Sequence, residues 1–164
     1  MDNDFRFPVR KRIRLDPGSY QQGHVFFITI GAHERFPWFG KHHELADATV
    51  SLLRTIGSER KTIFYAWCVM PDHVHILLKD DNVIEFVRLF KGKMVPEARA
   101  YGEGRKLWQR SFYDHGIRSE ESLSDIAVYI WENPVRKGLV ATHELYLWSG
   151  SQVWPDWHRF YRQG

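Results

Sequence analysis

Hydrophobic positions along the chain alternate between short β-branched and aromatic runs and longer stretches that repeat every three or four residues. The short runs are typical of strands, and the longer repeats are typical of helices with one apolar face. Strands are therefore predicted over 24–30, 62–70 and 73–79 and within 107–118. Helices are predicted over 41–57 with a stop at Gly57, over 82–94 with Asn82 as the cap, and from Ser119 or Ser122 to a stop at Pro134.

The order of these elements predicts an α+β fold. Pro71-Asp72 forms a turn between the second and third predicted strands, so these two strands pair antiparallel. The resulting βαββαβ order is that of a ferredoxin-like or RRM-like domain, an antiparallel sheet with helices packed on one face and the other face free. An open sheet face suits single-stranded nucleic acid, although the same fold serves many functions.

Composition indicates one globular domain inside the cell. The 164 residues are 43% hydrophobic and 15% aromatic, which is enough for one sizeable core. The single cysteine, Cys68, can form no internal disulfide, and its apolar neighbours favour a core position. The chain shows no signal-like segment and no apolar run near the ~18 residues that a membrane span needs, so we expect a cytoplasmic protein with no membrane partner.

Positive charge is concentrated at the start of the chain. Residues 1–14 hold five basic and two acidic side chains, so this segment accounts for the whole net charge of +3. A basic arm of this kind indicates contact with a polyanion, and a solvated leader is the alternative. We therefore predict a basic arm over 1–22, a folded domain over 23–148 and an aromatic and basic tail over 149–164.

Candidate chemistry begins in the third predicted strand. Side chains alternate along a strand, so His73 and His75 project on one side and Val74 on the other. Two interpretations stay open for this pair: metal ligands rigidly spaced by the strand, or a polar strand face that happens to be histidine. On the third predicted helix, Tyr129 and Asn133 are four residues apart and share a face. Taken alone, such a tyrosine is typical of a core rim, and an asparagine before proline is typical of a helix end.

Four separated motifs agree in order and spacing with one known family. They are VMPDHVHILL at 69–78, RLFKGKM at 88–94, LWQRSFYDHGIR at 107–118 and YIWENPVRKGLV at 129–140. Together they resemble the REP-associated tyrosine transposases, relatives of the single-strand insertion-sequence transposases in the HUH nuclease superfamily. The resemblance runs from about Phe26 to Trp148, and Asp72 stands where family members often have asparagine.

The resemblance implies a metal-dependent tyrosine endonuclease that cuts and rejoins single-stranded or hairpin DNA of the repetitive extragenic palindrome type. It implies that His73 and His75 bind a divalent metal, Mg²⁺ or Mn²⁺, that Asn133 completes the metal site, and that Tyr129 is the nucleophile. Tyrosine has an ordinary pKa near 10, so the nucleophile needs activation by nearby groups at neutral pH. The expected intermediate is a 5′-phosphotyrosine. Residues 23–148 would then be the HUH transposase domain of a cytoplasmic, nucleoid-associated protein.

DNA contacts are predicted at basic positions in the arm, on the second predicted helix and near the last two motifs. They are Arg10, Lys11, Arg12, Arg14, Arg88, Lys91, Lys93, Arg118 and Arg136. Single-strand binders pair such groups with aromatic platforms, which the tail could offer at Trp154, Trp157, Phe160 and Tyr161 unless these are core residues. The chain is expected to act as a monomer or a homodimer.

Two other functions stand as alternatives. A non-catalytic nucleic-acid-binding module of the same fold would use the basic arm and the sheet aromatics, but it has no need of the histidine, tyrosine and asparagine set. A zinc-dependent hydrolase needs a third histidine or acidic ligand and a carboxylate base near the pair. Asp72 is the only adjacent acid, and in an ideal strand it faces away. The histidines at 42, 43, 143 and 158 are predicted to be surface residues.

Overall fold

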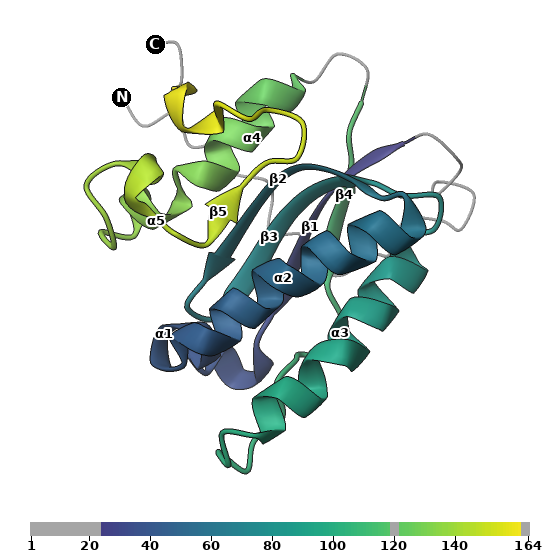
Figure 1. Cartoon of the computed structure of the whole chain (residues 1–164), viewed down its shortest axis with the longest axis vertical. Coiled ribbons are helices and arrows are strands. Elements are labelled where there is room, and N and C mark those ends of the chain that lie inside the picture. Colours follow the sequence, from purple (N-terminus) through teal and green to yellow (C-terminus); the bar gives the residue numbers. More distant parts are fainter. Residues whose placement is uncertain (1–23, 119–121, 162–164) are drawn as a thin grey trace.

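The computed structural model describes residues 24–118 and 122–161, and in it five strands form one antiparallel sheet (Figure 1). The strands are β1 (Val25–Gly31), β2 (Ile63–Met70), β3 (His73–Lys79), β4 (Tyr113–Gly116) and β5 (Ser149–Gly150). Their order across the sheet is β4-β1-β3-β2-β5. The predicted α+β class with an antiparallel βαββαβ sheet is confirmed, and β5 extends it beside β2.

Three helices of the described residues agree with the three predicted ones in position but not in length, and two short helices, α1 (Trp38–Lys41) and α5 (Asn133–Arg136), were not predicted. The three are α2 (His43–Arg60), α3 (Val83–Arg99) and α4 (Leu123–Trp131), and the 3-10 turns are η2 (His33–Arg35), η3 (His143–Leu145) and η4 (Trp157–Arg159). The predicted stop of α2 at Gly57 is wrong, because the helix continues to Arg60 and ends at Lys61, whose backbone is left-handed. Gly57 lies instead against the ring of Phe64, where a larger side chain would collide.

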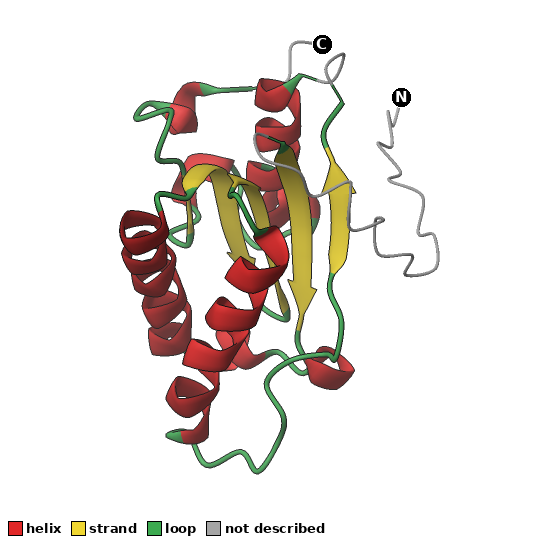
Figure 2. Cartoon of the chain, turned by 90° about the vertical axis from the view of Figure 1, so that its right-hand side faces the viewer, coloured by secondary structure: helices red, strands yellow, loops and turns green. Residues whose placement is uncertain are grey.

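One face of the sheet, here called the α2/α3 face, is covered by the two long helices. Figures 1 and 2 show α2 and α3 together on one side of the strands. The residues of β3 that point to this side, Val74, Ile76 and Leu78, are completely buried. They share one cluster with Leu53 of α2 and Phe86 of α3. Because burial of apolar surface is the main favourable term in folding, this cluster is the principal core.

The opposite face, here called the α4 face, is covered as well. α4 packs against β2 and β3, and its residues Ile130 and Trp131 form a second apolar cluster with Phe27 and Leu77 of the sheet. The prediction that helices pack on one face and leave the other free is therefore wrong. A free face would expose the apolar residues that β1, β2 and β3 direct to this side, and α4 buries them.

α4 begins where the sequence predicts and ends earlier. The Oγ atom of Ser122 caps it by accepting a hydrogen bond from the backbone N–H of Asp125, with 3.3 Å between the heavy atoms. The chain then continues as α5, in whose first turn Pro134 lies, a position where the missing N–H of proline is tolerated. The predicted stop at Pro134 is therefore wrong, and Asn133 occupies the junction between two helices.

The C-terminal segment completes the layer on the α4 face. The indole of Trp131 donates a 3.0 Å hydrogen bond to the carbonyl of Gly150 in β5. The rings of Trp154, Trp157 and Phe160 then pack around the same indole, so these three tail aromatics contribute to packing. The predicted boundary between 148 and 149 falls at the start of β5. Within the described residues, no helix combines the length and the hydropathy that crossing a membrane requires.

Candidate functional site

The histidine pair opens β3 on the α4 face of the sheet. The register of β1 against β3 places Thr29 opposite His75 and Gly31 opposite His73. The two imidazole rings approach through their Nε2 atoms, which are 3.0 Å apart. Each outer Nδ1 atom has a protein partner: Asp72 Oδ1 lies 2.6 Å from His73, and Thr29 Oγ1 lies 2.8 Å from His75. Both Nε2 atoms are therefore directed to one point.

This arrangement fits a divalent metal held between the two Nε2 atoms. Ligand nitrogens lie about 2.1 Å from such a metal, so two of them are about 3.0 Å apart at a right angle and about 3.4 Å apart at a tetrahedral angle. The 3.0 Å separation of His73 and His75 matches the right angle of octahedral coordination. A direct hydrogen bond between the rings has the same length. The pair is thus preorganised for a metal but does not by itself require one.

Asp72 orients His73, which corrects an expectation from the sequence. The ideal strand directs Asp72 away from the pair, but the residue lies in the turn before β3, and its carboxylate reaches the Nδ1 atom of His73. Burial raises the pKa of this carboxyl, yet the hydrogen bond and charge of His73 and the charge of Arg35 outweigh burial and lower the pKa overall. An ionised Asp72 holds a proton on Nδ1 of His73 and leaves the Nε2 lone pair for a ligand.

His75 is held neutral by its surroundings. Loss of contact with water lowers its pKa well below the usual value, a proton on the neighbouring His73 would oppose a second one, and the charges of Arg136 and Arg35 act in the same direction. A neutral imidazole is the form that binds a metal. When Thr29 accepts the Nδ1 proton of His75, the Nε2 lone pairs of both rings face the same point.

Tyr129 projects from α4 onto the same side of the sheet. Its ring meets the ring of Phe27 edge-on, with 6.3 Å between the centroids. Phe27 is also 5.5 Å from the ring of His75. Docking of α4 on the sheet therefore brings Tyr129 and His75 against the same phenylalanine of β1. The sequence predicted the two residues but not the contact that relates them.

Asn133 lies one turn after Tyr129 and is buried, with 7% of its surface exposed. Its Nδ2 atom faces the backbone carbonyl of Tyr129 at 3.5 Å, so Oδ1, the atom that a hard cation binds, is directed elsewhere. Among residues 24–118 and 122–161, no group of three or more His, Cys, Asp or Glu side chains is placed to hold a metal ion. The described residues thus lack the ligand set of a zinc hydrolase, and a complete metal site would need amide, substrate or water oxygens beside the pair.

Arg136 lies closer to the candidate nucleophile than the sequence indicated. Its guanidinium is stacked over the ring of Tyr129, 4.2 Å from the centroid, and its Nη2 donates to the backbone carbonyl of Tyr129 at 2.7 Å. Glu132 holds the other side of the guanidinium at 3.7 Å. The positive charge of Arg136 also contributes to lowering the pKa of His75. Sequence reasoning included Arg136 only as a general DNA contact, because the spacing from 129 to 136 does not reveal a ring contact.

The other predicted DNA contacts differ in their surroundings. Arg10, Lys11, Arg12 and Arg14 lie outside the described residues. Arg88 is exposed and pairs with Glu85 at 2.6 Å. Lys91 donates a 2.6 Å hydrogen bond to the carbonyl of Gln109 and so anchors the segment before β4. Lys93 and Arg118 are exposed on the surface. DNA contact at these positions stays a prediction.

Two of the remaining histidines are not the surface residues that the sequence predicts. His143 is 1% exposed and lies against Trp157, because η3 is folded under the C-terminal segment. His42 is half-buried, and its Nε2 lies 2.7 Å from a carboxylate oxygen of Glu103. The side chains of the other two, His43 and His158, are exposed as predicted. Burial of His143 and His42 reflects packing that local sequence does not reveal.

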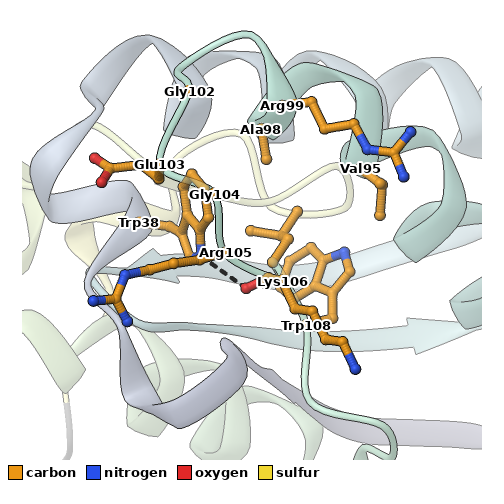
Figure 3. A pocket seen from close by; sticks show the side chains of 11 residues that line it. Trp38, Val95, Ala98, Arg99, Gly102, Glu103, Gly104, Arg105, Lys106 and Trp108 are labelled. Carbon is orange, nitrogen blue, oxygen red and sulfur yellow. Dashed lines mark hydrogen bonds between the residues drawn. The ribbon is translucent and has the colours of Figure 1, made fainter.

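A cavity of 660 Å³ opens beside the end of α3 (Figure 3). Trp38 and Trp108 form part of its wall, and the Trp38 indole donates to the carbonyl of Lys106 at 3.3 Å. Both indoles belong to the core of the α2/α3 face. None of the predicted site residues that the structure describes lines this cavity. The candidate site is therefore a surface between strand and helix on the α4 face, separate from this hollow.

A strand-borne histidine pair beside a helix-borne tyrosine on an antiparallel sheet is the arrangement expected of the single-tyrosine HUH transposases. A family model described as IS200-like transposase matches residues 21–133, most of the chain. The chain belongs to this transposase family.

Curated relatives agree with this family. A REP-associated tyrosine transposase of Escherichia coli K12 is 26% identical over 129 residues, which cover 74% of this chain and 72% of the relative. A Haemophilus influenzae protein, provisionally named a REP-associated tyrosine transposase, is 30% identical over 113 residues, 56% of this chain. The match spans 64% of that relative's length. The predicted resemblance to REP-associated tyrosine transposases is confirmed.

A solved structure shares the fold. It is a REP-associated tyrosine transposase bound to a REP hairpin, 23% identical to this chain, with a TM-score of 0.67. The superposition covers 85% of this chain and 82% of the other.

Proposed function

We propose that the protein is a metal-dependent tyrosine endonuclease that cuts and rejoins single-stranded or hairpin DNA. The observation that carries the proposal is the 3.0 Å approach of two Nε2 atoms, each with its Nδ1 held, on the sheet face where α4 presents Tyr129. A hairpin of the REP type is the favoured substrate, because a structural relative is bound to a REP hairpin and two curated relatives carry REP-associated names.

In this proposal the Oη atom of Tyr129 attacks a backbone phosphorus. The bond from phosphorus to the 3′ oxygen breaks, the 3′ oxygen takes up a proton, and the 5′ phosphate stays on the tyrosine. Attack by a 3′-hydroxyl on this phosphotyrosine reverses the step and joins strands without an external energy source. His73 and His75 would hold Mg²⁺ or Mn²⁺, and Asn133 would complete the site once its amide turns Oδ1 toward them. The ion would supply positive charge against the phosphate and help to fix its orientation.

Arg136 is the residue of this chain that acts on the nucleophile. A tyrosine attacks as phenolate, and a guanidinium over the ring stabilises the negative charge that develops there. The hydrogen bond from Arg136 to the carbonyl of Tyr129 keeps the guanidinium in place. Arg136 also gives the scissile phosphate a positive partner beside Tyr129.

The test is covalent capture of DNA by the tyrosine. A DNA hairpin with a single-stranded flank, labelled at its 3′ end, is incubated with the protein and Mn²⁺ and separated on a denaturing gel. The wild type should form a protein–DNA adduct, and Tyr129→Phe should form none while retaining its unfolding temperature.

Tyr113 supplies the matched control, because its ring also contacts Phe27, with 6.4 Å between centroids. Tyr113→Phe should still form the adduct. Hairpin binding by a wild-type protein that forms no adduct would instead favour a non-catalytic binding module, and an adduct mapped to Tyr113 would overturn the assignment of the nucleophile.

A further inference from the structure

Gln109 is fixed beside the end of β1 by its own backbone. Its N–H donates to the carbonyl of Gly31 at 2.9 Å, and its carbonyl accepts from Lys91 Nζ at 2.6 Å. The preceding residue, Trp108, forms a bridge with Ala32. The segment that follows the cavity loop is therefore attached to the strand that lies next to the histidine pair.

The side chain of Gln109 lies on Gly31. A Cβ atom built on Gly31 would be 3.0 Å from both Cδ and Oε1 of Gln109, closer than ordinary contact. Gly31 alternates with Thr29 along β1, and Thr29 hydrogen-bonds His75, so position 31 also points to the α4 face. Its glycine leaves the space that the carboxamide fills.

The register places this carboxamide next to His73. Gly31 and His73 are directly opposite each other in the antiparallel pair, and side chains at opposite positions have Cβ atoms roughly 5 Å apart. The carboxamide, at 3.0 Å from the Cβ position of Gly31, thus lies over the position directly opposite His73, on the same face of the sheet. Asp72 is not available to the carboxamide, because its carboxylate already contacts His73 at 2.6 Å and Arg35 at 2.9 Å.

The carboxamide is also open to a ligand. Within residues 24–118 and 122–161, the structure gives the Gln109 side chain no hydrogen-bond partner, although the residue is half-buried. A carboxamide offers two N–H donors and one acceptor, and because the residue is only half-buried these atoms are accessible to a bound molecule. A neutral donor next to the histidine pair suits a phosphate oxygen, because it adds no charge that would compete with a bound cation.

We propose that Gln109 is a DNA-contacting residue of the histidine site, whose carboxamide donates a hydrogen bond to a backbone phosphate of the strand that Tyr129 cleaves. The proposal rests on the proposed endonuclease function and adds a residue from the segment before β4 to the β3 and α4 residues. It makes Gly31 the positioning residue, since any side chain there displaces the carboxamide.

The experiment measures single-turnover cleavage of the hairpin substrate with Mn²⁺ for three variants. Gln109→Met keeps the length and volume of the side chain, and we expect it to slow cleavage by about tenfold to a hundredfold, the usual range for one hydrogen bond to a charged group. Gln109→Glu should slow cleavage further because a carboxylate repels the phosphate. Gly31→Ala leaves Gln109 intact but displaces it, so it should slow cleavage in the same direction.

Two further measurements separate a DNA contact from other roles. Mn²⁺ affinity, measured by calorimetry without DNA, should stay within about threefold of the wild type in Gln109→Met, because the side chain contacts phosphate and not the metal. The unfolding temperature should also stay unchanged. Gln152→Met is the structural control, since the Oε1 atom of Gln152 accepts from the backbone N–H of Phe64 at 3.0 Å. This control should lower the unfolding temperature and leave the cleavage rate unchanged.

Each adverse outcome is distinct. Wild-type cleavage with unchanged rates in both Gln109→Met and Gly31→Ala would overturn the Gln109 proposal and leave the endonuclease standing. A parallel loss of Mn²⁺ affinity in Gln109→Met would overturn it in favour of a metal ligand. A wild type that forms no adduct would overturn the endonuclease itself, and the Gln109 contact with it.

Discussion

On the α2/α3 face the sheet meets two long helices through apolar side chains, whereas on the α4 face apolar packing covers only part of the strands. β3 shows the difference within one strand. Val74, Ile76 and Leu78 enter the α2/α3 core, and on the other side Leu77 is buried under α4 while His73 and His75 form the polar pair. One face of β3 therefore contributes to stability, and the first residues on its other face form the candidate site.

Packing on the α2/α3 face explains how the two histidines are held so closely. Two imidazoles with Nε2 atoms 3.0 Å apart need a backbone that does not move, and the completely buried neighbours on the opposite face of β3 hold that backbone in place. Thr29 and Asp72 then fix the two rings from outside. We therefore expect substitutions on the α2/α3 face to change stability and substitutions at the polar end of the α4 face to change the cleavage reaction.

The largest effect is expected at the histidine pair. His75→Ala removes one of two Nε2 atoms directed to the same point, so Mn²⁺-dependent cleavage should fall by roughly 1000-fold or more, while hairpin binding changes little. Ile76→Val, the next residue on the opposite face, should cost about 1 kcal/mol of stability and leave cleavage unchanged. Cleavage by His75→Ala at the wild-type rate in a chelator would contradict a metal role for the pair.

A large stability effect is expected from Phe86 of α3. Its ring is fully buried and contacts the rings of Phe64 and Phe90, so Phe86→Ala should lower the free energy of unfolding by about 3–5 kcal/mol. Denaturant unfolding measures this loss. The folded fraction at low temperature should cleave at nearly the wild-type rate. A selective loss of Mn²⁺ affinity in the folded protein would show that the two faces are not independent.

Most of the α2/α3 face could be predicted from the sequence, because its signals are local. Alternation along β3 and the three- and four-residue repeat of α3 identified the buried positions, and Asn82 caps α3 by accepting from the N–H of Glu85 at 3.1 Å, as predicted. Gly57 misled the prediction, because glycine both ends helices and permits close packing. Here it permits close packing, since the ring of Phe64 lies against it.

The α4 face was less predictable, because its contacts join distant segments. The sequence identifies His73, His75 and Tyr129 but not the sheet face on which α4 docks. For this reason one face was predicted to be free, whereas α4 covers it. The sequence does hold one signal: apolar residues occupy consecutive positions of α4 from Ile126 to Val128, which indicates a helix that is buried on more than one side. Asp72 was misplaced because strand alternation does not extend into a turn.

An intermediate effect is expected at Asp72. Asp72→Ala removes the acceptor that holds Nδ1 of His73, and loss of such an outer partner commonly costs 10- to 100-fold in metal affinity, so Mn²⁺ binding should weaken by roughly that factor. Asp72→Asn keeps an oxygen acceptor and should retain most of the affinity. Calorimetry with Mn²⁺ measures both variants. Equal losses in the two would show that the charge of Asp72 matters more than its hydrogen bond.

The smallest effect compares the two helix caps, one on each face. Ser122 caps α4, and Asn82 caps α3, each by accepting from the backbone N–H three residues later at 3.3 and 3.1 Å. Ser122→Ala and Asn82→Ala should each cost about 1 kcal/mol of stability, because one backbone donor loses its partner. Only Ser122→Ala should also slow adduct formation, by a few-fold, since α4 carries Tyr129 and fraying of its first turn loosens the ring against Phe27. Chemical denaturation and the adduct assay, run on both variants, measure these two quantities. Equal slowing by Asn82→Ala would mean that the site responds to overall stability rather than to the docking of α4.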